Sequence, residues 1–388
     1  MSQAFGLDRR YDVICLSHLR WNFVYQRPQH LMTRCAKERR VFFVEEPVFG
    51  RTLVPRVEIE AADLVTVVVP QLPMESSDVS EQQRQLLDEV IRLADVRDFL
   101  LWYYTPMALE FTRHLTPRAT VYDCMDELSA FKNAPSALRE LDAELMQRSS
   151  LVLTGGQSIY EARRYAHHNI HPLPSSVDVQ HFARARSIET DPADQAAIAQ
   201  PRLGFFGVID ERMDLALIEG VATSRPDWQI VIVGPVVKID PASLPRRPNI
   251  HYLGSKTYEE LPHYIAGWDV ALLPFARNAA TQFISPTKTP EYMAAGKPVV
   301  STSIRDVVRP YGQQGLVRIA DTVAEFIHAC TAAMYENGET RQRAGDAFLR
   351  QTSWDGTWNR VRVLLDDATR AHHHVNVNKV AVVDAATA

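Results

Sequence analysis

The sequence predicts an α/β protein made of two Rossmann-like, doubly wound domains that face each other across a cleft. Apolar runs of strand length alternate with helical segments, and this alternation occurs twice along the chain. The 388 residues, 46% of them hydrophobic, exceed the usual size of a single core. A turn rich in proline and serine at residues 173–178 separates the two halves.

The first half contains the elements expected of one doubly wound domain. Helical periodicity is found at residues 29–37, 81–96 and 138–149, between the apolar runs. The predicted strands are residues 11–17, 41–44, 64–69, 99–104, 119–122 and 151–154.

The second half repeats this order, with a helical segment at residues 215–222 after its first strand. The last helical segment, 354–368, places Trp354, Trp358, Val361 and either Leu364 or Leu365 at helical spacing, so one of its faces should be buried. The predicted strands of this half are residues 202–206, 229–233, 250–253, 270–274, 298–301 and 316–319. We expect domains at 1–175 and 176–350, a returning helix at 351–370 and a flexible tail at 371–388.

Composition excludes several classes of protein. A net charge of -5 and a pI near 6.2, without a face rich in lysine or arginine, argue against nucleic-acid binding. The four cysteines are scattered through apolar or helical segments, which indicates buried thiols rather than disulfides or a metal site. The chain shows neither an apolar segment of signal-peptide type nor a run of about 18 apolar residues, so we expect a cytoplasmic protein.

Residues 285–301 predict an anion-binding loop and helix. Pro290 has no N–H and must lie in the first helical turn, which places the N-cap at Thr287 or Thr289. Free amides near Lys288 and its positive charge suit a phosphate, and Glu291, one turn further on, can accept hydrogen bonds from two sugar hydroxyls. An ordinary helix start followed by a helix-to-strand turn is the alternative.

A second element upstream supports a ligand site. Residues 201–212 form a predicted strand that ends in a glycine turn at Gly207, and glycine at such a turn lets the backbone approach a ligand. Arg212, just after this turn, is the natural partner for a diphosphate. A solvated surface arginine is the alternative.

Polar and aromatic residues follow three predicted strands of the first domain. His18, Arg20 and Trp21 follow the first strand and should face the cleft, although His18 could be an ordinary loop histidine and Trp21 a core residue. Asp126 belongs to an acidic cluster that could serve as a base or an acceptor clamp, or cap the next helix. Tyr104 could offer an aromatic platform for a sugar ring, or simply pack.

The order of these motifs, over residues 11–368, resembles that of GT-B glycosyltransferases. The similarity is to glycosyltransferase family 4 and to related, family 1-like bacterial enzymes of polysaccharide synthesis. The motifs that carry it are Trp21 with 26–30, Tyr122 and Asp123 with Asp126 and Glu127, 175–178 before Phe182, 249–254, and 285–288 with Glu291.

The resemblance implies a division of roles between the domains. The second domain would bind a nucleotide-diphosphate sugar and the first an acceptor, which Arg20, Trp21 and Tyr104 are predicted to contact. Arg212 and Lys288 would neutralise the leaving diphosphate without a metal, and Asp126 and His18 are the catalytic candidates in the first domain. The predicted donor contacts are Glu291 to the ribose, Leu253 and Gly254 to the nucleobase, and Gly207, Ser285, Pro286 and Thr287 to the remainder.

Two departures from the family pattern concern the sugar and the domain junction. Phe283 stands where many retaining members carry a second glutamate, so the sugar hydroxyls would be held by amides of 282–285 or by Asn278, and retention of the anomeric configuration stays open. Ser175 and Ser176 replace the usual Asn-Gly of the junction.

The predicted function is therefore metal-independent hexosyl transfer, from a nucleotide-diphosphate sugar to a saccharide or lipid-linked acceptor, in bacterial cell-surface polysaccharide or glycoconjugate synthesis. The alternatives are a GT-B nucleotide-sugar epimerase and a degenerate subunit that only binds nucleotide sugar. No cofactor and no nucleic-acid partner are expected. A location at the inner face of the membrane, with peripheral association, and the oligomeric state stay open.

Overall fold

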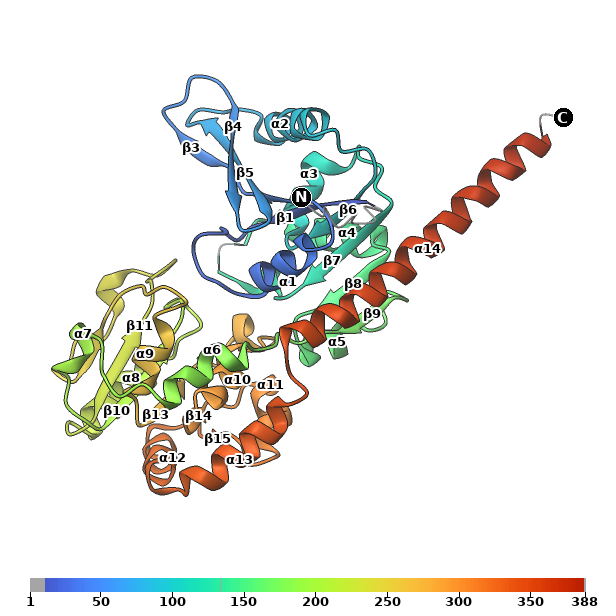
Figure 1. Ribbon diagram of the computed structural model, residues 1–388. Coiled ribbons are helices and arrows are strands. Elements are labelled where there is room, and N and C mark those ends of the chain that lie inside the picture. The colour runs from blue at the N-terminus through green and yellow to red at the C-terminus, as the bar shows by residue number, and fades with distance from the viewer. Residues whose placement is uncertain (1–10, 133, 387–388) are drawn as a thin grey trace, which may run out of the picture.

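The computed structural model describes residues 11–132 and 134–386, with only the backbone described for 371–386. Two α/β domains lie one above the other, and a long C-terminal helix runs from the second back along the first (Figure 1). We call the unit around the nine-stranded sheet the first domain and the unit around the six-stranded sheet the second domain.

The first domain has the strand order β3-β5-β2-β1-β6-β7-β8-β9, and β4 pairs antiparallel with β5. Its strands are β1 (Asp12–Ser17), β2 (Val41–Glu45), β3 (Val48–Gly50), β4 (Arg56–Ala62), β5 (Val65–Pro73), β6 (Phe99–Tyr103), β7 (Ala119–Cys124), β8 (Leu151–Thr154) and β9 (Ile170–Pro172). Its helices are α1 (Arg27–Ala36), α2 (Val79–Leu93), α3 (Leu109–Thr112), α4 (Leu138–Arg148) and α5 (Gln157–Arg163). All six predicted strands are present, and β3, β4 and β9 are additional.

The second domain is a parallel sheet in the order β12-β11-β10-β13-β14-β15. Its strands are β10 (Arg202–Phe206), β11 (Gln229–Val233), β12 (Ile250–Tyr252), β13 (Val270–Leu273), β14 (Val299–Ser301) and β15 (Arg318–Ile319). Its helices are α6 (Val179–Ala183), α7 (Ala193–Ala196), α8 (Leu215–Ser224), α9 (Leu261–Ala266), α10 (Lys288–Ala294), α11 (Arg305–Val307), α12 (Val323–Tyr335) and α13 (Gly338–Leu349).

The order of the strands determines which loops lie where ligands of such sheets bind. In both sheets the chain first builds outward from the first strand on one side and then returns to its other side, so β1 lies between β2 and β6, and β10 between β11 and β13. Ligands of such sheets bind beyond the carboxyl ends of the strands where the order reverses. His18 follows β1 and Gly207 follows β10, so both residues lie at these reversal points.

Apolar residues on both faces of the first sheet are buried. Along β1, Val13 and Cys15 join one cluster while Ile14 and Leu16 join another, which is the alternation expected of a strand covered on both faces. All four cysteines are buried free thiols, as the sequence predicts.

The C-terminal helix α14 (Trp354–Ala386) lies on the first domain, where it contacts α1, β7 and β8. Trp354, Trp358, Val361 and Leu365 are buried in a cluster with first-domain residues, which confirms the predicted returning helix and selects Leu365 over Leu364 as the buried leucine. The helix continues to Ala386, through the segment where we expect a flexible tail, and the side chains of that segment lie outside the described residues. Across the described chain, every helix is too short or too polar to cross a bilayer.

Candidate active site

Helix α10 begins where the sequence predicts. Thr287 is the N-cap, Lys288 the first helical residue, and Pro290 lies in the first turn. Gly296 has φ +76 and follows the last turn, and Pro298 then leads into β14. These local signals start and stop the short helix, and Lys288, at its first position, lines the cavity between the domains.

Lys288 lies in a partly aromatic setting at the end of β10. Its ammonium is 5.7 Å from the ring centroid of Phe205 and 5.9 Å from that of Phe206. A Cβ on Gly207, where φ is +134, would lie 2.2 Å from Cε of Lys288, so only glycine fits there. Burial lowers the pKa of Lys288, Glu291 opposes this shift, and Arg212 adds to it. Within the described chain Lys288 forms no ion pair, so its charge can serve an anionic ligand.

Glu291 is a buried carboxylate with an unused acceptor. The residue is 7% exposed, and its Oε2 has no hydrogen-bond partner among the described residues. Burial raises the pKa of Glu291 to about 7, and the charge of Lys288 opposes that shift. A buried acceptor without a partner is costly, so a donor from a ligand or from water suits this position.

Tyr258, which the sequence analysis missed, presents a second buried polar atom near Glu291. Its hydroxyl also has no partner within the described structure, and burial followed by the charge of Glu291 raises its pKa. The ring is stacked on His181 at 4.0 Å and lies 4.8 Å from Tyr25 of the first domain. Its importance depends on contacts between distant segments, so neither periodicity nor a motif marks it in the sequence.

Arg212 is paired with a neighbouring carboxylate. Its guanidinium donates to both oxygens of Asp210, at 3.0 and 3.1 Å from Nε and 2.7 Å from Nη2. The guanidinium carbon lies 5.5 Å from the ring centroid of Phe131 of the first domain. The side chain is therefore fixed at the domain interface, which rejects the alternative of a solvated surface arginine. A diphosphate would share Arg212 with Asp210.

Asp126 approaches these cations from the first domain. It follows β7, and burial raises its pKa while the charge of Arg212 opposes the shift. Asp126, Arg212 and Lys288 line one small cavity of about 90 Å³ between the domains, together with Gln26, Arg27 and Ser285. A drug-sized ligand needs a cleft of about 300 Å³ or more. The cavity is therefore smaller than a site for a drug-sized ligand.

His18 is not among the residues that line this cavity. The residue is half-buried, and desolvation of its imidazole, with a smaller contribution from the charge of Lys238, lowers its pKa to about 4. Nδ1 has no hydrogen-bond partner in the described part of the chain. His18 is therefore a neutral group with one unused nitrogen, and its catalytic role stays a prediction.

Two of the three predicted acceptor residues are buried, and the third, Arg20, is ion-paired and stays a prediction. Trp21 is 6% exposed and packs edge-on against Phe43 at 4.9 Å, and Tyr104 is 1% exposed. Arg20 pairs with Glu45 at 2.9 Å and also donates to the carbonyl of Pro47. Both aromatic residues belong to the core cluster of the first domain, Tyr104 because it continues the apolar pattern of β6, and Arg20 holds the loop after β2 in place.

A larger cavity of about 340 Å³ lies at the carboxyl ends of β1, β2 and β6. Its lining combines apolar side chains such as Phe49, Met107 and Phe111 with polar ones, among them Ser17, Thr105, Glu45, Glu46 and Glu110. The sequence analysis did not select these walls, because β3 is three residues long and α3 four, too short for a periodic pattern.

The contact of Leu253 and Gly254 with a nucleobase stays a prediction. Gly254 follows β12 with φ +71, its carbonyl accepts from Gly234 N at 2.8 Å, and open space surrounds the position of a Cβ. Leu253 is half-buried beside it. This backbone is accessible to a planar ligand.

Phe283, at the position of the missing glutamate, packs against the apolar cluster of the first domain. Asn278, offered above as a substitute ligand for the sugar, instead accepts from Thr281 N at 3.2 Å and donates to the carbonyl of Glu211 at 3.1 Å. The segment is thus used for contact between the domains.

Phe283→Glu should therefore destabilise the protein, because a carboxylate would replace an aromatic ring against an apolar surface. We expect a loss of about 1–3 kcal/mol of unfolding free energy. Chemical denaturation measures it, with Gln282→Glu at the exposed neighbour as the control. Equal stability of the two variants would show that the Phe283 contact is unimportant.

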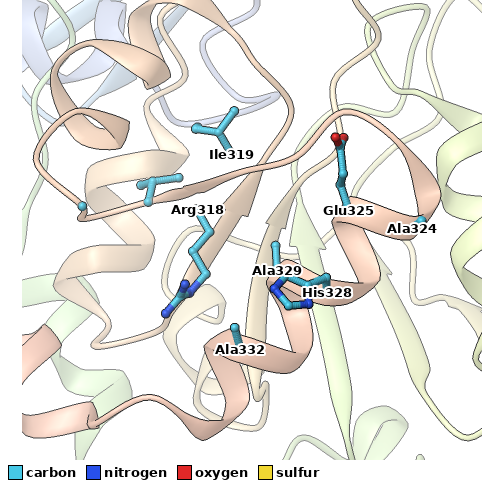
Figure 2. Close-up of a pocket in the computed structure, with 9 residues that line it drawn as sticks. Arg318, Ile319, Ala324, Glu325, His328, Ala329 and Ala332 are labelled. Atoms are coloured by element: carbon cyan, nitrogen blue, oxygen red, sulfur yellow. The ribbon is translucent and has the colours of Figure 1, made fainter.

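A surface depression of about 710 Å³ lies apart from the cleft, between β15 and α12. Figure 2 shows Arg318 on the strand side and Glu325 and His328 on the helix side. Arg318 is engaged by Glu336 at 2.8 Å, and none of the predicted site residues lines this depression. Among the residues described, no three His, Cys, Asp or Glu side chains are grouped as metal ligands there or elsewhere.

Comparison with known proteins identifies similar sequences and folds. Residues 200–336 match the family model described as Glycosyl transferases group 1. The chain is 27% identical over 295 residues to the "Putative teichuronic acid biosynthesis glycosyltransferase TuaH" of Bacillus subtilis (strain 168), which covers 70% of this chain and 72% of that protein.

Two solved structures share the fold at low identity. Sucrose-phosphate synthase from Thermosynechococcus elongatus superposes with a TM-score of 0.71 at 13% identity, covering 93% of this chain and 100% of that one. Anabaena Alr3699/HepE in complex with UDP and glucose gives a TM-score of 0.64 at 16% identity, covering 91% and 99%. The predicted fold class is confirmed. The chain is a glycosyltransferase with the GT-B fold, similar to glycosyltransferase families 4 and 1.

Proposed function

We propose that the protein transfers a hexosyl group from a UDP-sugar to a saccharide or lipid-linked acceptor during bacterial cell-surface polysaccharide synthesis. The observation that carries this proposal is the buried, unpartnered Glu291 carboxylate beside Lys288. A carboxylate suits ribose hydroxyls and an unpaired ammonium suits a diphosphate. The relative from B. subtilis is named for teichuronic acid synthesis, and HepE was solved with UDP-glucose, which supports both the pathway and the nucleotide.

The proposed chemistry is electrostatic. As the bond from the anomeric carbon to the diphosphate oxygen breaks, negative charge develops on UDP. Lys288 and Arg212 stabilise this charge in a site that excludes most water. The acceptor oxygen bonds to the anomeric carbon and its proton leaves. Asp126, on the first-domain side of the cavity and with a raised pKa, is the group proposed to receive that proton.

Neither alternative is favoured by the comparisons, which name glycosyltransferases rather than epimerases or binding subunits. We further propose that no metal or other cofactor takes part, since two cations of the chain already face the diphosphate position. A location at the inner face of the membrane belongs to the same proposal, because a lipid-linked acceptor would be found there.

UDP should bind without divalent metal. Isothermal titration in EDTA and in magnesium is expected to give the same Kd, because Lys288 and Arg212 supply the positive charge. CDP and ADP titrated in parallel test the choice of base. A strict requirement for magnesium would contradict the proposed electrostatic role of the two side chains.

A further inference from the structure

Lys238 is a lysine of the second domain that reaches the first domain. It belongs to the loop after β11, and its ammonium lies 5.7 Å from the ring centroid of Phe131. The guanidinium carbon of Arg212 lies 5.5 Å from the same centroid. Arg212 is paired with Asp210, whereas no carboxylate of the described chain forms an ion pair with Lys238. Two cations of one domain therefore meet one aromatic ring of the other, and Lys238 is the one without a paired carboxylate.

The backbone at Lys238 is unusual and firmly held. Lys238 has φ +62, in the left-handed region that residues other than glycine rarely adopt. The residues before it are bonded to the loop that carries Arg212. Ile209 N donates to the carbonyl of Pro235 at 2.9 Å, and Val237 N donates to the carbonyl of Ile209 at 3.0 Å. Such backbone strain persists only where the surroundings impose it, and it is concentrated at ligand sites.

Lys238 lies between the small cavity and the larger cavity. It is not among the residues that line the small cavity with Arg212 and Lys288. Its charge instead helps to lower the pKa of His18, which follows β1, and opposes the burial that raises the pKa of Glu46, which follows β2. Glu46 lines the larger cavity of the first domain. The ammonium is therefore placed beside that cavity rather than at the diphosphate position.

The lining of the larger cavity disfavours an anion inside it. Among the described lining residues are the carboxylates of Glu45, Glu46 and Glu110, and none is a lysine or arginine. Glu45 is engaged by Arg20 at 2.9 Å, which leaves Glu46 and Glu110 without a cation in the lining. Carboxylates accept hydrogen bonds from sugar hydroxyls but repel another negative group. An anionic substituent of a ligand in this cavity is thus directed outward, to the side where Lys238 lies.

We propose that Lys238 binds an oxyanion of the acceptor, either a phosphate or a carboxylate attached to the saccharide that enters the larger cavity. An ammonium on a flexible stem suits either group, because it acts as a point charge without a fixed bonding geometry. This inference rests on the proposed function for the existence of an acceptor. It gives the second domain, which carries the predicted donor site, one acceptor-binding residue, and it makes acidic acceptors better substrates than neutral ones.

Ligand-observed NMR on the UDP-saturated protein, at constant ionic strength, tests the inference with three sugar probes. Methyl glucoside is neutral, glucose 1-phosphate carries a phosphate and methyl glucuronide carries a carboxylate. The wild type should bind at least one charged probe about tenfold more tightly than the neutral one, the effect of a single hydrogen bond to a charged group. Lys238→Gln should remove this preference, and Lys238→Arg should keep most of it.

The matched control is Lys37→Gln. Lys37 is the exposed C-cap residue of α1, and Lys238 is likewise exposed, so neither substitution opens a cavity in the core. Lys37→Gln should keep the preference of the wild type for charged probes. A loss of the preference in both variants would show a general effect of net charge and would overturn the assignment to Lys238.

The two charged probes distinguish the source of the oxyanion. Tighter binding of glucose 1-phosphate indicates a phosphorylated acceptor, and tighter binding of methyl glucuronide indicates an acidic saccharide; either result supports the inference. Equal binding of charged and neutral probes by the wild type, or a preference that persists in Lys238→Gln, would overturn it. UDP titration of the wild type tests the proposed function separately, and the comparison of Lys238→Gln with the wild type reports on Lys238 whether or not UDP binds.

Discussion

Lys288→Ala is expected to weaken UDP binding by about 1.5–3 kcal/mol, or roughly 10-fold to 150-fold in Kd, the range for hydrogen bonds to charged groups. The ammonium lies beside Phe205 and Phe206 at the carboxyl end of β10, and no carboxylate of the described chain forms an ion pair with it. Removing it should therefore cost affinity for the diphosphate without unpairing a protein group. Isothermal titration measures the change, and circular dichroism checks the fold.

Lys297→Ala is the matched control for this substitution. Lys297 is a second partly buried lysine of the same domain, and its ammonium donates to the carbonyl of Ala266 at 2.7 Å, outside the cleft cavity. Its loss should leave the Kd for UDP unchanged. Wild-type affinity in Lys288→Ala, or an unfolded Lys288→Ala protein, would count against the assigned role.

UDP affinity should fall as the pH is lowered through the pKa of Glu291, which burial raises to about 7. The ionised carboxylate accepts hydrogen bonds from ribose hydroxyls better than the protonated one, so Kd should rise by up to about tenfold for each pH unit below that value. Glu291→Gln should bind more weakly at pH 8 and lose the pH dependence. Calorimetry in buffers of different ionisation enthalpy should also show proton release on binding near neutral pH.

The stability of the ligand-free protein should instead increase as the pH is lowered. The folded-state pKa of Glu291 lies above its usual value of 4.5, so ionisation is less favourable in the folded protein than in the unfolded chain. The unfolding free energy contributed by this group is therefore highest below 4.5 and is lost as the pH rises toward about 7. Glu291→Gln should remove that loss, which denaturation at both ends of the range can measure.

A 2′-deoxyribose analogue of UDP distinguishes the ribose role from a helix-dipole role. The wild type should lose affinity when the hydroxyl is removed, and Glu291→Gln should lose much less, because the partner has already been weakened. Equal losses would disprove the pairing. If Glu291 only stabilised α10, the variant would bind UDP normally and be less stable by about 0.3–1 kcal/mol.

The sequence predicts the regular elements well where burial gives a simple pattern. Strands covered on both faces are continuous apolar runs, and α10 is bounded by Pro290 and Gly296, whose backbone restrictions are local. β4 escapes prediction because its residues are mostly exposed and its sequence, RVEIEAA, mixes charged with apolar residues. Its pairing with β5 is visible only in three dimensions.

The candidate site is likewise only partly predictable from the sequence. Lys288 and Glu291 are predictable because one helix carries both, whereas the unpartnered hydroxyl of Tyr258 and the approach of Asp126 to Arg212 depend on the fold. Trp21 was ambiguous from sequence because an aromatic residue after a strand can either pack or face a cleft. Its edge-on contact with Phe43 shows that Trp21 packs in the core.

The most direct test of glycosyl transfer by this cleft is UDP release from a panel of UDP-sugars in the presence of a bacterial lipid extract, with the products followed by NMR. At least one sugar should give UDP together with a glycosylated lipid or saccharide, and Lys288→Ala should reduce that rate strongly under the same conditions. An epimerised nucleotide sugar without UDP release, or binding of every sugar with no product, would contradict it.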